Sequence, residues 1–302
     1  METNISHLRD IATALVRINP YISADELSPA LNIPHDEADR LLTSLDAEAT
    51  TGSEKEAALT RRFIRAVNHA DSAAVQQCLN EGLTVNRPLQ RLYKESVTPL
   101  LYACISSESR ACEQDADIVQ QLLAAGADPN TCDEQGDTPL MYVSAPAIIR
   151  HLLNAGADAT HRGSAQRCVL HYPDRFYDAE AVRLLLAAGA PADAIDTNGC
   201  STLFCKICGL NADRSDILSL LLAAGAPLEH RDNQGYTALE AALADHYYPY
   251  AALLLRHGAR PAPNTLPDFL TRELTIGEGK EEILKALLQE RIARTAKKSN
   301  GE

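Results

Sequence analysis

The chain has 302 residues, and 28 lysine and arginine residues against 41 aspartate and glutamate residues give it a formal net charge of −13. An acidic surface of this kind repels phosphate backbones, so broad nucleic-acid binding is not expected. No apolar run is long enough to span a membrane, and the N-terminus has neither a basic start nor an apolar stretch. The eight cysteines are irregularly spaced, which favours reduced thiols and a cytoplasmic protein.

Residues 1–57 form the first predicted domain, a helical segment that is more acidic than the rest. It contains 11 acidic and 4 basic residues. An amphipathic pattern predicts a helix over 7–18, a capping box predicts a second helix starting after Ser23, and a turn at Pro34 leads into a third that ends near Asp46. The segment is therefore expected to contain three short helices.

The apolar spacing of this segment resembles a helix-turn-helix or winged-helix unit, whose third helix would enter the DNA major groove. That helix would begin His35-Asp36-Glu37-Ala38-Asp39-Arg40, where phosphate contact requires lysine and arginine. A helical cap docked on the following segment is the competing interpretation. In that case an arginine cluster could face the acidic helices. Its members are Arg61, Arg62 and Arg65.

Residues 58–267 contain a repeated phrase, a leucine-rich stretch that runs into a glycine. The glycines are Gly82, Gly126, Gly156, Gly189, Gly225 and Gly258. Their separations of 44, 30, 33, 36 and 33 residues indicate stacked helical repeats. The first repeat, over 58–82, is degenerate, and residues 268–302 are expected to form a C-terminal helical cap.

A second anchor precedes each later glycine and keeps the same register. It reads Thr98-Pro99-Leu100, Thr138-Pro139-Leu140, Cys168-Val169-Leu170-His171, Ser201-Thr202-Leu203 and Thr237-Ala238-Leu239. Together with the Leu-Leu-Ala-Ala-Gly-Ala-Asp-Pro-Asn sequence of residues 122–130, these anchors resemble the ankyrin-repeat family. The resemblance implies an all-α solenoid of helix-turn-helix units with short hairpin fingers. It also implies that His171 is a hydrogen-bonded scaffold residue.

Elementary backbone chemistry assigns each piece of the repeat a structural role. A threonine or serine before a helix can cap its free amides, and proline suits the first helical turn. The glycine ends the second helix in a left-handed conformation. Asp-x-x-Gly sequences that begin at Asp133, Asp196 and Asp232 then predict tight turns at the tips of the fingers.

No catalytic, metal or cofactor site is predicted. Cys205-Lys206-Ile207-Cys208, with Cys200 nearby, has the C-x-x-C spacing of zinc and redox sites. This motif lacks a second pair of metal ligands, and Cys205 holds a position that is tyrosine in other repeats. A role for these cysteines as packed, buried side chains is therefore favoured. The common phosphate-loop, nucleophile and zinc motifs are absent, so the sequence predicts a protein that is not an enzyme.

Binding of a protein partner remains, and two faces are candidates. The first combines the fingertips with the first helices, and its residues are Asp133, Glu134, Gln135, Asp137, Thr197, Asn198, Arg231, Asn233, Gln234 and Tyr236. The second is the edge formed by the turns between the paired helices, and its residues are Tyr177, Tyr247 and Tyr248. Fingertip aspartates also serve as plain turn formers, and the tyrosines could instead fill gaps between repeats.

The sequence therefore predicts a module that binds a protein with a basic surface. One use of such binding is to inhibit the partner, as an immunity protein does. An adaptor or host-directed effector is the alternative within the same class. A DNA-binding regulator that uses residues 1–57 is the alternative from another class.

Overall fold

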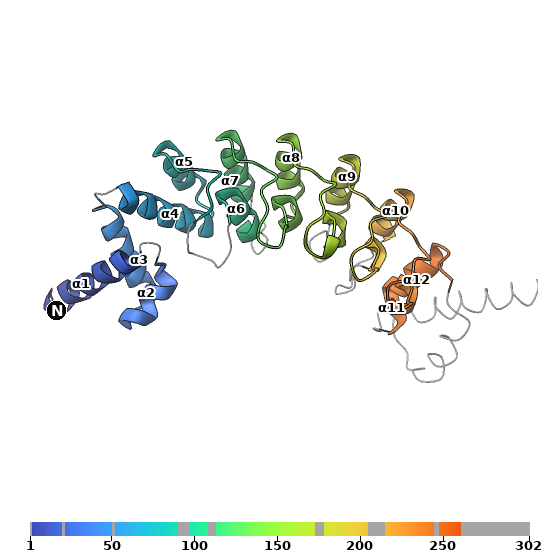
Figure 1. The fold of residues 1–302 in the computed structure, drawn as a ribbon, viewed down its shortest axis with the longest axis horizontal. Coiled ribbons are helices and arrows are strands. Elements are labelled where there is room, and N and C mark those ends of the chain that lie inside the picture. The colour runs from blue at the N-terminus through green and yellow to red at the C-terminus, as the bar shows by residue number, and fades with distance from the viewer. Residues whose placement is uncertain are drawn as a thin grey trace, which may run out of the picture. The chain divides into compact units, whose positions relative to one another are not determined.

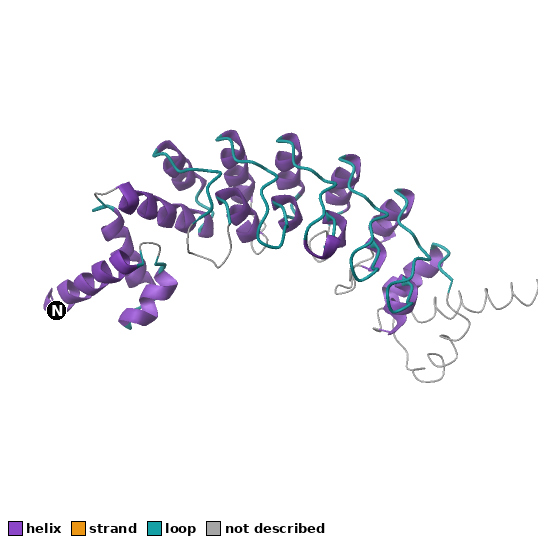
Figure 2. Cartoon of the chain, in the orientation of Figure 1, coloured by secondary structure: helices purple, strands orange, loops and turns teal. Residues whose placement is uncertain are grey.

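The computed structural model describes residues 2–19, 22–49, 52–89, 97–107, 113–172, 178–204, 215–244 and 248–260. Within these ranges the chain forms twelve α-helices and four short 3-10 helices, with two isolated bridges and no strand (Figures 1 and 2). The predicted all-α fold is confirmed. None of the described helices is both long and apolar enough to cross a membrane. The described residues fall into two compact units, one ending at Asp158 and the next beginning at Ala159.

The first unit opens with the three predicted helices. They are α1 (Glu2–Ile18), α2 (Ala24–Leu31) and α3 (His35–Asp46). The capping box starts α2 as predicted, because Ser23 Oγ accepts the Glu26 amide at 3.3 Å and the Glu26 carboxylate accepts the Ser23 amide at 3.1 Å. Asn32 then ends α2 in the left-handed conformation and turns the chain toward α3.

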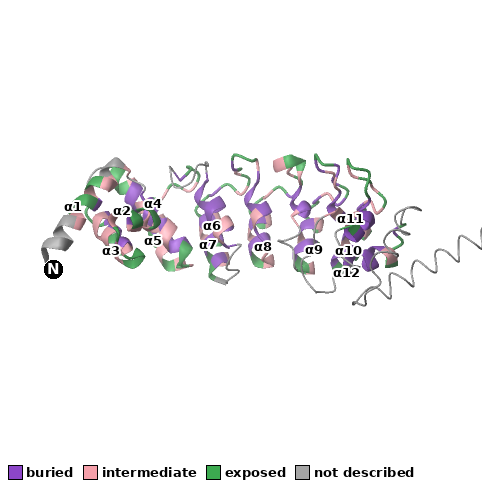
Figure 3. Ribbon diagram, turned by 90° about the horizontal axis from the view of Figure 1, so that it is seen from below, coloured by how far each residue is buried: buried purple, intermediate pink, exposed green. Residues whose placement is uncertain are grey.

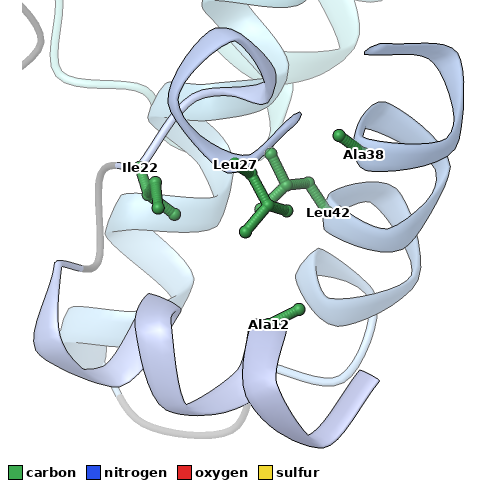
Figure 4. Close-up of a cluster of buried hydrophobic side chains, with 5 residues drawn as sticks. All are labelled: Ala12, Ile22, Leu27, Ala38 and Leu42. Carbon is green, nitrogen blue, oxygen red and sulfur yellow. The ribbon is translucent and has the colours of Figure 1, made fainter. Parts of the chain in front are cut away.

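These helices share a small hydrophobic core of their own, which Figure 4 shows in close-up. Its buried members are Ala12, Ile22, Leu27, Ala38 and Leu42. Partly buried side chains surround it, namely Leu15, Val16, Ala24, Leu31, Ile33 and Leu45. All of them precede the fourth helix, so α1–α3 form a bundle that packs around itself.

Helices α4 (Gly52–Asn68) and α5 (Ser72–Asn80) follow and pack against each other. The domain boundary predicted between residues 57 and 58 falls inside α4, because the helix already begins at Gly52. The carboxylate of Asp71 caps α5 by accepting the Ala74 amide at 2.9 Å. α4 is thus the element that connects the α1–α3 bundle to the repeats.

The predicted contact between the arginine cluster and the acidic helices is confirmed for two of the three arginines. Arg61 Nε donates to Asp46 Oδ1 at 2.8 Å, and both side chains are buried. Arg65 Nε donates to Asp39 Oδ1 at 2.6 Å. Arg62 points elsewhere and pairs with Glu81 at the end of α5, with Nη2 and Oε1 2.9 Å apart.

The burial of Asp46 leads to a pH-dependent prediction. Burial raises the pKa of the Asp46 carboxyl, although the hydrogen bonds and charge of Arg61 act in the opposite direction. A raised pKa means that the folded state takes up a proton before the unfolded state does as the pH falls. We therefore expect wild type to gain stability relative to Asp46→Asn as the pH is lowered through that raised pKa toward the ordinary aspartate pKa of about 3.9. Urea unfolding at a series of pH values measures this, and a constant difference would contradict it.

The remaining elements of the first unit belong to the repeats. They are α6 (Pro99–Ser107), α7 (Glu113–Ala124), η1 (Pro139–Tyr142) and α8 (Pro146–Asn154). α7 packs against α5, α6 and α8, and the interior between them is filled by fully buried side chains. Leu101, Leu122, Leu140 and Ile149 are among these, so neighbouring repeats supply one another's core (Figure 3).

The second unit continues the same pattern. Its elements are η2 (Ser164–Gln166), η3 (Val169–His171), α9 (Ala179–Ala187), η5 (Thr202–Phe204), α10 (Ser215–Ala223), α11 (Ala238–Ala244) and α12 (Tyr248–Arg256). α10 packs against α9 and α12, and α11 packs against α12. Leu185, Leu221 and Leu254 are buried in this stack.

The glycines at the ends of the second helices adopt the predicted conformation. From Gly82 to Gly258, all six have φ between 89° and 100°, a region that side chains with a Cβ avoid. At Gly126, the amide of the next residue, Ala127, donates back to Leu122 O at 3.0 Å, which closes the end of α7.

The repeat that begins at Thr138 departs from the expected pair of helices. Its first helix is reduced to the single 3-10 turn η1, and α8 starts only four residues later. Pro146 lies at the first position of α8 and the preceding Ala145 is extended, as the residue before a proline prefers. The 30-residue spacing between Gly126 and Gly156 goes with a first helix of one 3-10 turn and a link of only three residues to α8.

An asparagine joins successive repeats within the first unit. Asn130 Nδ2 donates to Gly156 O at 3.0 Å and Asn130 Oδ1 accepts the Asp158 amide at 2.8 Å. Asn86 makes the same two bonds to Gly126 O and the Asp128 amide. Each asparagine thus satisfies a carbonyl at one helix end and an amide in the following finger.

We expect Asn130→Ala to lower the free energy of unfolding by about 1–2 kcal/mol, because two hydrogen bonds between repeats are lost while the freed groups can still reach water. Urea unfolding measures the loss. Gln120→Ala, at an exposed position of α7, is the matched control and should change stability by less than about 0.5 kcal/mol. Equal effects of the two substitutions would contradict the bridging role of Asn130.

Several predicted features lie outside the described residues. The C-terminal cap over 268–302 is one, and Cys205, Cys208, Tyr177 and Tyr247 are others. Tyr248 is the first residue of α12, but its side chain is also outside the description. These predictions stay as they were stated.

Candidate protein-binding surface

Three of the described fingers are each held in shape by one aspartate. Asp133 Oδ1 accepts the amides of Gln135 at 2.9 Å and Asp137 at 2.8 Å. Asp196 and Asp232 bind the amides two and four residues ahead in the same way, at distances of 2.8–2.9 Å. Because each carboxylate closes its own turn, the predicted Asp-x-x-Gly turns are present and their aspartates are structural.

Only part of the first predicted fingertip faces solvent. Asp133 is 8% exposed and also accepts a hydrogen bond from the Tyr142 hydroxyl. Asp137 is 7% exposed. Glu134 and Gln135 are exposed between them. The side chains that this finger presents are therefore Glu134 and Gln135.

Two fingers of the second unit are stacked directly on each other. The Asn233 amide donates to Asn198 O at 3.1 Å, and Asn233 Nδ2 donates to Thr197 O at 3.0 Å. A Cβ at Gly199 would lie 2.5 Å from Asn233 Oδ1 and 2.8 Å from the Asn233 backbone nitrogen. Thr197 and Asn198 are exposed, while their carbonyls hold the neighbouring finger in register.

The last described finger carries the most prominent exposed side chain. Tyr236 is 44% exposed, and Gln234 beside it is exposed as well. Arg231, by contrast, reaches back to its own repeat, where Nη1 is 2.9 Å from Glu240 Oε2. Glu240 also accepts the Thr237 amide at 2.9 Å, so this ion pair braces the base of the finger.

The finger over residues 163–167 lacks both the aspartate and the glycine of the Asp-x-x-Gly turn. Gly163 holds the place of the turn aspartate, since its amide donates to Arg167 O as the Asp133 amide donates to Asp137 O. Gln166 holds the place of the glycine at φ 59°, and Ala165 beside it is at φ 54°. Two side-chain-bearing residues are therefore held in the left-handed region, which is unfavourable.

We expect Gln166→Gly to raise the free energy of unfolding by about 0.5–1 kcal/mol, because removal of the left-handed strain outweighs the extra chain entropy of glycine. Gln166→Ala keeps the strain and serves as the control. Thermal unfolding of the three proteins tests this, and a glycine variant less stable than the alanine variant would contradict it.

Tyr250 lies close in sequence to the second predicted face, two residues after Tyr248. Tyr250 is 8% exposed, and its hydroxyl donates to Leu203 O at 2.6 Å. This side chain ties α12 to the preceding repeat. Tyr250 therefore illustrates the gap-filling alternative that the sequence left open for the tyrosines of this edge.

Cys168, Cys200 and His171 have the features of packing residues. Cys168 Sγ lies 3.1 Å from His171 Nδ1, which also accepts the Cys168 amide, and His171 Nε2 lies 3.2 Å from Cys200 O. Burial raises the pKa of the Cys168 thiol and lowers the pKa of the His171 imidazole, so both are neutral near pH 7. Burial raises the pKa of Cys200 too, and Asp196 adds to the effect.

In the part of the chain that the structure describes, no three His, Cys, Asp or Glu side chains could hold a metal.

The helix that would enter DNA is engaged within the protein. Asp39 and Asp46 of α3 pair with arginines of α4, and Ala38 and Leu42 are buried in the bundle core. The outward side of α3 presents Asp36, which pairs with Arg40 at 3.7 Å. Acidic groups are thus prominent on both sides of this helix.

A family model described as ankyrin repeats in three copies matches residues 109–194 and 170–265, which together span more than half of the chain. The chain belongs to the ankyrin-repeat family. Ankyrin repeats form a protein–protein interaction module, and the helical repeats with their fingers agree with this assignment. No curated protein sequence matches the chain.

Solved ankyrin-repeat structures share the fold. The human ASB11 ankyrin repeat domain is 21% identical with a TM-score of 0.55, covering 74% of this chain and 96% of that one. A second match is a chain in the structure of the Bdellovibrio bacteriovorus predatory endopeptidase Bd0816 in complex with immunity protein Bd3460. It is 21% identical with a TM-score of 0.52, and the match covers 65% of this chain and 97% of that one. An ankyrin repeat domain from Acinetobacter baumannii is 25% identical with a TM-score of 0.49, covering 66% and 98%.

Proposed function

We propose that this ankyrin-repeat protein is a non-enzymatic binding protein that recognises one protein partner through its fingertips. The observation that carries the proposal is Tyr236, a large side chain that is 44% exposed at the tip of a finger. Asp232 and the stacked Asn233 hold that finger in place, so the tyrosine is presented from a rigid base. Tyrosine is enriched at binding hot spots because it buries much area at a low entropy cost.

The proposed contact residues are the predicted side chains that remain exposed. They are Glu134, Gln135, Thr197, Asn198, Arg231, Asn233, Gln234 and Tyr236. Asp133 and Asp137 act through the shape of the fingers in this proposal. The net charge of −13 and the exposed Glu134 support a partner with a basic surface, because opposite charges accelerate the encounter.

A photo-crosslinking amino acid at position 234 of the full chain is the first experiment. The cross-linked partner is identified by mass spectrometry and then purified, and its affinity is measured by calorimetry. Tyr236→Ala should weaken binding tenfold or more. Ile11→Ala, which removes the other large exposed apolar side chain in the described ranges, should leave the affinity unchanged. Equal effects of the two substitutions would overturn the fingertip site.

Inhibition of the partner, as by an immunity protein, is the narrower proposal. The Bdellovibrio structure carries an immunity protein in its name, although a likeness at 21% identity extends to the fold alone. An inhibitor is expected to bind one to one and to abolish the partner's activity. An adaptor or host-directed effector would bind without loss of that activity, so an assay of the identified partner separates these uses.

A further inference from the structure

The contact between the α1–α3 bundle and α4 differs from the contacts between repeats. The bundle has its own core, and every member of that core precedes α4. Two ion pairs cross to α4 instead, Asp46 to Arg61 and Asp39 to Arg65. Charged pairs are therefore a prominent part of this contact.

The same contact is bordered by empty space. A small open pocket of about 80 Å³ is lined by residues of α2, α3 and α4, among them Leu42, Ile64 and Asn68. A larger open hollow of about 690 Å³ lies on the other side, and Asp46 and Leu59 are among the residues that line it. Both pockets open to solvent, whereas the repeat interiors are filled by close-packed leucines.

The carboxylate of Asp46 is incompletely satisfied in this contact. Its Oδ1 accepts from Arg61, while Oδ2 is buried and has no hydrogen-bond partner among the described residues. Desolvation of a charge that is only partly compensated weakens an ion pair. Charge and geometry therefore hold the docked arrangement.

The geometry of the pairs defines what fits on α4. Arg61 and Arg65 are four residues apart and so lie on one face of α4. Asp39 and Asp46 are seven residues apart, two turns of α3, and also share a face. The earlier aspartate pairs with the later arginine, so the two helices are matched in an antiparallel sense.

We propose that the Arg61 and Arg65 face of α4 is a binding site for an acidic helix of a partner protein, and that α3 occupies this site in the free protein. The matching segment carries two carboxylates seven residues apart. The bundle detaches as a unit when such a helix competes for the arginines. This site is independent of the fingertip surface, and its test does not use the fingertip partner.

The experiment uses a fluorescent peptide of residues 34–49 and the full-length chain. In the variant Asp39→Arg/Asp46→Arg the tethered α3 is repelled, so the peptide should bind at least tenfold more tightly than it binds wild type, measured by anisotropy. The variant Asp10→Arg/Asp36→Arg changes the net charge equally at exposed positions and should bind like wild type. A peptide carrying Asp39→Asn and Asp46→Asn should not bind. Equal binding to all three proteins, or undiminished binding of the asparagine peptide, would overturn the proposal.

A second measurement covers the case in which the charge-reversal variant fails to fold. Native-state hydrogen exchange of the wild-type protein should show amides of α1–α3 opening together, at a lower free energy than amides of α7 and α8. If the amides of α1–α3 exchanged only at the same free energy as those of α7 and α8, the bundle would not detach as a unit and the proposal would be contradicted.

Discussion

Replacement of Arg61 by methionine is expected to lower the stability of the α3–α4 contact by about 3–4 kcal/mol at pH 7. Breaking a buried pair leaves the other charge without compensation. The buried Asp46 then takes up a proton, and holding an aspartate of ordinary pKa protonated at pH 7 costs about 4 kcal/mol, which limits the loss. Hydrogen-exchange free energies of α3 amides measure it.

Two further variants separate a buried charge from lost packing. The double variant Asp46→Leu/Arg61→Met removes both charges and should recover most of the loss, because an apolar pair of similar volume is often neutral or stabilising. Arg62→Met breaks the partly exposed pair with Glu81 on the same helix and should cost less than about 1 kcal/mol. A double variant as unstable as Arg61→Met would show that the pair does not act through uncompensated charge.

Replacement of Gly199 by alanine is expected to lower the free energy of unfolding by about 3 kcal/mol. Gly199 has φ 75°, where a Cβ is strained, and that Cβ would overlap Asn233, including its backbone nitrogen. Relief of the overlap requires the two fingers to separate, which breaks the bond from the Asn233 amide to Asn198 O. Both the strain and the lost contact add to the cost.

Gly235 is the matched control for this substitution. It occupies the same position in the next finger at φ 86°, and a Cβ there would meet no atom within 4 Å. Gly235→Ala should therefore cost only the backbone strain, about 1 kcal/mol. Urea unfolding of both variants gives the difference. Equal costs would mean that the close approach of the fingers at Gly199 is not maintained in solution.

The repeat architecture could be predicted because its signals are local. Left-handed helix ends require glycine, and fingertip turns require aspartate and glycine at fixed offsets, so both leave a periodic trace in the sequence. The capping box at Ser23 is read in the same way. Where the trace is missing, as at Gly163 and Gln166, the structure shows that the finger still forms and tolerates the strain.

The candidate site was only partly predictable for the opposite reason. Asp133 and Glu134 are neighbours with the same charge, yet one closes the turn and is buried while the other is exposed. Periodicity alone does not distinguish an aspartate that accepts two backbone amides from one that faces a partner. The bridging role of Asn130 was missed as well, although its place two residues after Asp128 in the repeat phrase was a usable signal.

By itself, the sequence determined the helical repeats, the ends of their second helices, the three-helix N-terminal segment and the attraction between its acidic helices and the arginines of α4. These depend on short-range backbone chemistry and on the sign of charge, which one chain displays directly. Only the tertiary structure decided which arginines pair with α3, which finger residues face solvent and how closely two fingers approach. Those outcomes depend on distances between segments far apart in the chain, which follow from the packing of the repeats.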